Sequence, residues 1–176
     1  NLGWIVCILG SIQVLFMQFI AGGMKDIEND FKRGAKTLAV HLGVRVQKNG
    51  SLEIPSSFKA LAYGVQIIDM IVVFLPFFVV WDINNLTLFQ YFQWFVISFI
   101  GIIMFLLSYK LISMKKFERV KARKLIGSHY MINFMLVPIM LMALNPWAGI
   151  LMFFPGFGYI LNNLIIHGTI LQPRTM

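Results

Sequence analysis

Charged residues are scarce in this chain, and their scarcity excludes a soluble domain. Only 12% of the 176 residues are charged, while 59% are hydrophobic. A soluble domain usually carries about 25% charged residues. Alternating strand-length segments are absent too, which argues against a membrane β-barrel. Composition therefore indicates an integral membrane protein of the helical class.

Cysteine is almost absent as well, because the chain has one cysteine, Cys7. A single cysteine excludes an intrachain disulfide, and no Cys/His cluster has metal-ligand spacing. The N-terminus lacks both a methionine and a charged segment, so it is not typical of a signal peptide. It begins inside an apolar run, and we expect this chain to be the C-terminal part of a longer protein.

What the chain does contain is a series of apolar runs close to the ~20 residues that a helix needs to cross a bilayer. Backbone groups in lipid must be satisfied internally, so such runs should be helices. The sequence predicts an all-α, polytopic transmembrane bundle that forms one domain over 1–176, with 147–176 as a C-terminal extension. The five expected spans are 2–22, 59–81, 88–109, 126–144 and 147–167.

The basic residues predict how these spans are oriented. With five crossings, the connections 24–58 and 110–125 and the tail after 168 share one side of the membrane. That side holds all fifteen Lys and Arg residues, whereas the opposite connections, near 82–86 and 145–147, hold none. The positive-inside rule makes the basic side cytoplasmic, in a plasma or inner membrane. Topology and anionic lipid headgroups explain the net charge of +8, so no nucleic-acid partner is expected.

Acidic residues concentrate just after the first span, where Asp26 and Asp30 form an Asp-x-x-x-Asp pair. Carboxylates four apart on a helix share one face and can bind the same divalent cation. Mg²⁺ prefers one or two carboxylates together with phosphate oxygens and water. The pair therefore favours a magnesium site, although the spacing alone also fits a solvated run of alternating charges. The basic residues expected to bind phosphate beside it are Lys25, Lys32, Arg33 and Lys36.

Residues 25–43 resemble the second acidic motif of the UbiA superfamily of intramembrane prenyltransferases. The resemblance covers most of 1–145, because that family continues with three more spans and a basic loop before the third. Ala39 stands where proline is frequent, and the span 147–167 lies beyond the usual ending. The matching residues are Asp26, Asp30, Lys32, Gly34, Lys36, Thr37, Leu38, Val40, Leu42 and Gly43.

The resemblance implies Mg²⁺-dependent transfer of a prenyl group from a polyprenyl diphosphate to a lipophilic acceptor. The acceptor would be an aromatic quinone precursor or a glycerol-phosphate lipid ether. Asp26 and Asp30 would be the catalytic residues and the metal ligands. The family's bundle has nine or more helices and a first acidic motif, which these residues lack. The N-terminal half of the same protein, or a second chain, is therefore an expected partner.

Three polar residues inside the expected spans are further candidates for substrate binding. Asp69 lies near the middle of its span, and an ionisable group there normally faces the bundle interior with a partner. His129 and Asn133 are one turn apart at the start of the fourth span. These side chains line an acceptor pocket or are ordinary contacts between helices, and the sequence leaves both interpretations open.

Two other functions compete with prenyl transfer. A transporter or channel would use Asp69 as an intramembrane ionisable site, but this leaves residues 25–43 unexplained. A membrane phosphatidyltransferase also uses an Asp-x-x-x-Asp pair. It requires an Asp-Gly-x-x-Ala-Arg segment upstream, and none is present.

Overall fold

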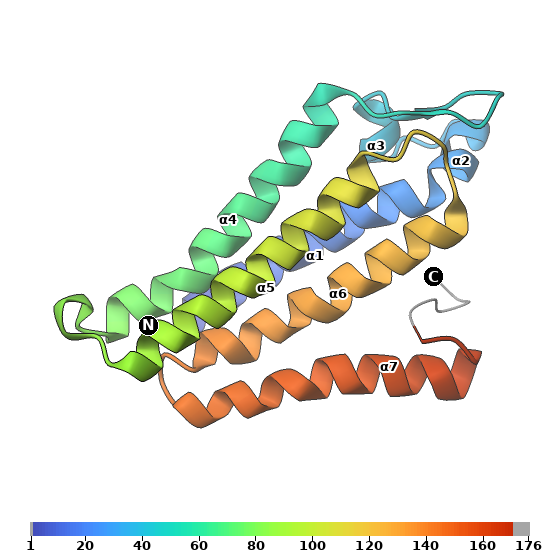
Figure 1. Ribbon diagram of the computed structural model, residues 1–176. Helices are drawn as coiled ribbons and strands as arrows, with labels where there is room; N and C mark the ends of the chain where they lie inside the picture. Colours follow the sequence, from blue (N-terminus) through green and yellow to red (C-terminus); the bar gives the residue numbers. More distant parts are fainter. Residues whose placement is uncertain (1, 171–176) are drawn as a thin grey trace.

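The computed structural model describes residues 2–170 and consists of long helices that lie side by side (Figure 1). Five of them are long and apolar enough to cross a membrane, which confirms the all-α class and the number of expected spans. The first is built from α1 (Leu2–Leu15), the π-helical η1 (Phe16–Gly22) and α2 (Gly23–Arg33). The others are α4 (Ser56–Val80), α5 (Leu88–Ile112), α6 (Arg119–Leu141), and η3 (Pro146–Met152) with α7 (Phe153–His167).

The first helix runs about three turns further than the sequence predicted. The expected loop over 24–58 begins with the helix α2, so this boundary is corrected. Gly22 and Gly23 do not break the helix, because both have right-handed helical dihedral angles. The helix ends at Gly34, whose φ of 64° is one that glycine adopts without steric cost.

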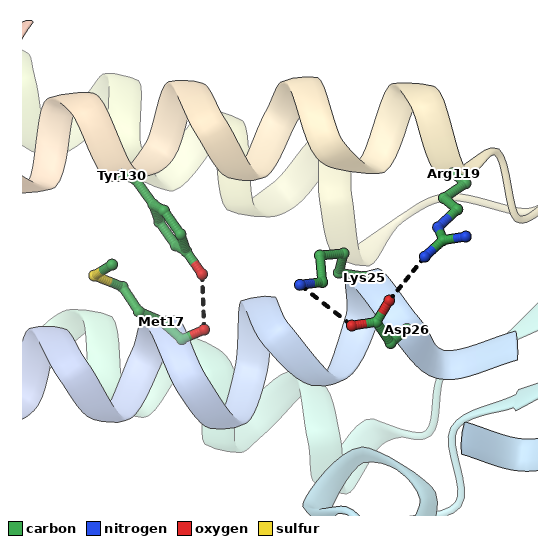
Figure 2. Close-up of polar contacts among 5 residues, drawn as sticks. All are labelled: Met17, Lys25, Asp26, Arg119 and Tyr130. Atoms are coloured by element: carbon green, nitrogen blue, oxygen red, sulfur yellow. Dashed lines mark hydrogen bonds and ion pairs between the residues drawn. The ribbon is translucent and has the colours of Figure 1, made fainter. Parts of the chain in front are cut away.

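A stretch of π-helix interrupts the first span at Phe16–Gly22. The wider turn changes the ordinary i→i−4 pattern and presents the Met17 carbonyl oxygen to α6, where the Tyr130 hydroxyl donates a hydrogen bond to it at 2.8 Å (Figure 2). The Phe16 ring stacks on His129 at 4.4 Å between centroids. The π-helical stretch therefore fixes how the first helix packs on α6.

The two expected basic connections meet at one end of the bundle. Between α2 and α4 lie a short helix, α3 (Leu38–His41), and an antiparallel pair, β1 (Arg45–Val46) and β2 (Leu52–Glu53). The connection 113–118 packs on this pair through two hydrogen bonds, from Leu52 N to Lys115 O and from Phe117 N to Gly50 O. The second connection is shorter than the expected 110–125, because α5 continues to Ile112 and α6 begins at Arg119.

The basic residues gather at this same end. Every Lys and Arg among residues 2–170 lies in α2, in the connections 34–55 and 113–118, or in the adjoining ends of α4, α5 and α6. The opposite connections, which contain η2 (Ile83–Asn85) and η3, hold none. Arg174, in the basic tail expected at this end, lies outside the described residues.

The interior has two apolar cores that follow one another along the bundle axis. One core, beside the basic end, includes Met24, Phe58 and Ile126. The other, toward the opposite end, includes Leu9, Phe77 and Leu136. Buried polar side chains lie near the boundary between these two cores: Gln13 in α1, Gln66 and Asp69 in α4, Ser108 in α5, and His129 and Asn133 in α6. We call the space among Gln66, Asp69, His129 and Asn133 the polar chamber.

Candidate functional site

A pocket of about 440 Å³ lies on α2 at the basic end of the first span. Asp26 and Asp30 both line it, as their spacing on one helical face predicts. Lys25 and Lys36 line it too, so carboxylates and ammonium groups share one space. We call it the carboxylate pocket, and its remaining lining residues are Gln18, Phe19, Gly22, Gly23, Thr37 and Leu38.

The far wall of the carboxylate pocket is the segment that leads into α3. A close contact with α2 holds this wall in place, because a Cβ added to Gly23 would lie 3.0 Å from the Cβ of Ala39. Ala39 is fully buried. Only glycine at position 23 permits this approach without a shift, so the pocket depends on a residue that carries no chemistry of its own.

Asp26 is paired with cations from two elements (Figure 2). Its Oδ1 lies 3.2 Å from a guanidinium nitrogen of Arg119, at the start of α6, and its Oδ2 lies 3.2 Å from Lys25 Nζ. The side chains of Asp26 and Arg119 are 35% and 46% exposed, and exposed pairs of this kind contribute about 1 kcal/mol or less to stability. The arrangement mainly places positive charge beside the carboxylate.

Asp30 differs from Asp26, because among residues 2–170 its carboxylate takes part in no ion pair or hydrogen bond. The buried Thr37 hydroxyl also has no partner within the described chain and lines the same pocket. Two carboxylates one turn apart, with a hydroxyl nearby, supply the hard oxygen atoms that Mg²⁺ prefers. The residues present therefore fit a magnesium ion that completes its coordination shell with phosphate oxygens and water.

Two of the predicted phosphate-binding residues lie outside the carboxylate pocket. Lys32 Nζ pairs with Glu28 Oε1 at 2.7 Å and lines a separate hollow beside β1. Arg33 is exposed at the end of α2 and is not among the residues that line the carboxylate pocket. The structure thus brings Lys25 and Lys36 to the carboxylates and leaves Lys32 and Arg33 at the surface of the same end.

The other three predicted residues, Asp69, His129 and Asn133, come together in the polar chamber and not in the carboxylate pocket. His129 follows Arg119 by ten residues on α6, which places it about 15 Å further along the helix axis. The space within the chamber does not admit a water molecule. In this conformation it has no room for the headgroup of an acceptor.

Sequence reasoning missed Arg119 as part of the site. Its partner Asp26 lies 93 positions away in the sequence. The one indication was that Arg119 belongs to the basic connection 110–125, which was expected on the same side of the membrane as Asp26. Ser108 was also missed, although it is fully buried and contacts Gln66. One serine in an apolar span gives no sign of facing a glutamine on another helix.

Comparison with known proteins assigns no function to the carboxylate pocket. No protein-family model, curated protein or solved structure matches the chain. The resemblance of residues 25–43 to the prenyltransferase motif therefore stays a prediction. Proposals about function depend on the motif and on the geometry of the pocket.

Proposed function

We propose that the carboxylate pocket binds the diphosphate group of a prenyl diphosphate together with Mg²⁺, and that the protein transfers the prenyl group to a lipophilic acceptor. The observation that carries the proposal is that Asp26 and Asp30 share one pocket with Lys25 and Lys36, at the end of an apolar span. The motif over 25–43 supports the same chemistry.

The ion pairs of Asp26 suit the binding of a diphosphate. Arg119 and Lys25 neutralise this carboxylate, and both cations have geometry and charge suited to phosphate oxygens. An entering diphosphate would take over these cations and release the Asp26 oxygens for the metal. Lys36, exposed at the pocket wall, adds a further positive charge.

The membrane side of the pocket offers a path for an isoprenoid tail. Phe19 lines the pocket and is about half exposed, and Leu15 and Ile8, further along the same helix, are exposed to a similar degree. A chain of isoprene units lying on these side chains would remain in the apolar layer while its diphosphate reaches the charged end. Such a path also keeps water from a reactive carbon centre.

In this proposal Asp26 and Asp30 would hold Mg²⁺, and the bound ion would draw negative charge from the departing diphosphate. Lys25, Lys36 and Arg119 stabilise the same developing charge. The allylic C–O bond breaks, the acceptor forms the new bond to carbon, and its proton is released. The acceptor is an aromatic quinone precursor or a glycerol-phosphate lipid ether. Two carboxylates occupy only part of the octahedral coordination shell of Mg²⁺. We therefore propose that a second acidic segment, from another part of the protein or a second chain, completes the site.

We also propose that the pocket faces the cytoplasm, in a plasma or inner membrane. The basis is the distribution of Lys and Arg, which among residues 2–170 lie at the end that carries the pocket. Membrane proteins retain such residues on the cytoplasmic side. Anionic headgroups of that leaflet would further hold the basic end in place.

The experiment is a transfer assay with labelled geranylgeranyl or polyprenyl diphosphate, Mg²⁺ and candidate acceptors, on the full-length protein in detergent. We expect Asp26→Ala and Asp30→Ala to lower transfer by at least about 10²- to 10³-fold, as removal of one charge-stabilising group does. The matched control is Glu28→Ala, because Glu28 lies on α2 between them but pairs with Lys32 outside the pocket. Full transfer by Asp26→Ala in the presence of EDTA would refute the proposal.

A further inference from the structure

The polar chamber is chemically incomplete. Its four polar side chains, Gln66, Asp69, His129 and Asn133, are each at most 3% exposed. Within residues 2–170, four of their atoms have no hydrogen-bond partner: Gln66 Oε1, Asp69 Oδ1, His129 Nδ1 and Asn133 Oδ1. Unpaired polar groups are costly in the interior of a membrane bundle, so a chamber that keeps them is suited to a guest that satisfies them.

The amide of Gln66 has a defined orientation. Its Nε2 lies 3.2 Å from the Met104 carbonyl oxygen, which can only accept a hydrogen bond, and 2.8 Å from Ser108 Oγ. The reverse orientation would place two acceptor oxygens against each other at Met104. The Oε1 atom of Gln66 is therefore the one that lacks a partner.

His129 lies beside the same amide, since Gln66 Nε2 is 2.8 Å from His129 Nε2. Asp69 takes part in no ion pair among residues 2–170, with His129 or with any Lys or Arg. The remaining lining residues, Phe16, Val65 and Met104, carry no charge. No paired cation therefore compensates the Asp69 carboxylate within the described chain.

We propose that the polar chamber binds one sodium ion, held by the Asp69 carboxylate and by the side-chain oxygens of Gln66 and Asn133. A buried carboxylate needs a compensating charge. All three residues line the chamber, and each has a buried side-chain oxygen without a partner among residues 2–170. Hard cations prefer oxygen ligands, and other membrane bundles bind sodium near the bilayer midplane. This site goes beyond the proposed transfer reaction and does not depend on it.

Charge and size select sodium among the common cations. One carboxylate balances one positive charge, so a divalent ion would leave excess charge in a medium of low dielectric constant. The chamber does not admit a water molecule, so the ion must bind without its hydration shell. Sodium is smaller than potassium, so a space this small favours sodium. A proton on Asp69 is the competitor for the same position.

The test is the thermal unfolding midpoint of the full protein in detergent, near pH 8, in sodium, potassium or choline chloride at equal ionic strength. At a sodium concentration roughly 100 times its Kd, we expect the midpoint to rise by about 5 °C or more over the potassium sample. The increase should shrink near pH 5, where a proton competes for Asp69. Among the lining residues the other titratable group is His129 on α6.

Asp69→Asn should abolish the difference between sodium and potassium. Asp82→Asn, the same change at an exposed carboxylate near the opposite end, should preserve it. If Asp69→Asn fails to fold, the cation series on the unmodified protein still decides. Equal midpoints in sodium and potassium at both pH values would overturn the proposal. A midpoint that responds to pH but equally in both salts would also overturn it, because the chamber would then bind a proton only.

Discussion

The carboxylate pocket and the polar chamber contain the same functional group in opposite surroundings. In the pocket, Asp26 is about one-third exposed and is held between two cations. In the chamber, Asp69 is 3% exposed, and the other polar lining side chains are two amides and an imidazole. An exposed ion pair can be replaced by contacts to an entering ligand with little loss of stability. A buried charge left without its partner destabilises the fold strongly. The pocket is therefore suited to turnover, and the chamber to a permanent guest.

The largest effect is expected at Gly23, where a substitution tests whether the close packing of α2 on α3 shapes the carboxylate pocket. Gly23→Ala places a Cβ 3.0 Å from Ala39, so α3 must shift, and we expect a loss of about 1–3 kcal/mol in stability together with weaker diphosphate binding. Gly64→Ala is the matched control, since beyond the neighbouring backbone of its own helix nothing lies within 4 Å of its added Cβ. Unfolding in denaturant and a diphosphate titration measure both quantities. Equal behaviour of the two variants would show that the contact with Ala39 does not shape the pocket.

A smaller loss of stability is expected at Ser108 in α5, and Ser128 in the neighbouring helix α6 serves as its control. Ser108→Ala removes the 2.8 Å contact with buried Gln66, and we expect it to cost about 1 kcal/mol, the typical net contribution of one intramolecular hydrogen bond. Ser128 bonds only the Lys124 carbonyl one turn away on its own helix, so Ser128→Ala should stay within about 0.5 kcal/mol of the parent. Thermal or denaturant unfolding of the pair provides the measurement. If Ser128→Ala lowers the free energy of unfolding as much as Ser108→Ala does, the contact between Ser108 and Gln66 makes no special contribution to stability.

The smallest effect concerns a third carboxylate, Asp82, which caps η2 between α4 and α5. Hydrogen bonds from the Asn85 side chain and the Asn84 backbone N–H hold the pKa of Asp82 below its usual value. A lowered pKa in the folded state means that these bonds stabilise the fold above the usual pKa. This contribution is lost as the pH falls through the lowered value.

We therefore expect the midpoint difference between the parent and Asp82→Asn to narrow as the pH is lowered from about 6 to about 3. The change should be small, because the group is fully exposed to solvent. Thermal unfolding over this pH range tests it. A difference that is constant with pH would mean that ionised Asp82 makes no contribution to the fold.

The sequence predicted most of the fold because membrane spans follow from local composition. Five helices, their common basic end and the shared face of Asp26 and Asp30 all depend on short-range patterns. A helix at Asp26 and Asp30 was predicted, but the bounds of the first span were set too short, because Gly22-Gly23 next to charged residues is also typical of a helix end. The π-helical stretch at Phe16–Gly22 has no pattern that distinguishes it from an ordinary turn.

The candidate site was predicted only in its local part. Lys25, Asp26, Asp30 and Lys36 are near in sequence and meet in one pocket, but Arg119 joins them from the start of α6. Its place depends on how α6 packs on the first helix, which the Tyr130–Met17 hydrogen bond helps to set. Likewise, Asp69, His129 and Asn133 were each recognised as unusual. They share a chamber with Gln66 because of how α4 and α6 are rotated about their axes, which periodicity in a uniformly apolar span does not reveal.

The most direct test of the central claim is calorimetric titration of Mg²⁺ and inorganic diphosphate into the full protein in detergent. If Asp30 is a metal ligand in the carboxylate pocket, the parent binds diphosphate only with Mg²⁺, and Asp30→Asn weakens this binding by at least about tenfold, roughly 1.4 kcal/mol. Glu28→Gln should bind as the parent does. Equal affinities of the parent and Asp30→Asn, or binding that is unchanged without Mg²⁺, would contradict the assignment of the pocket.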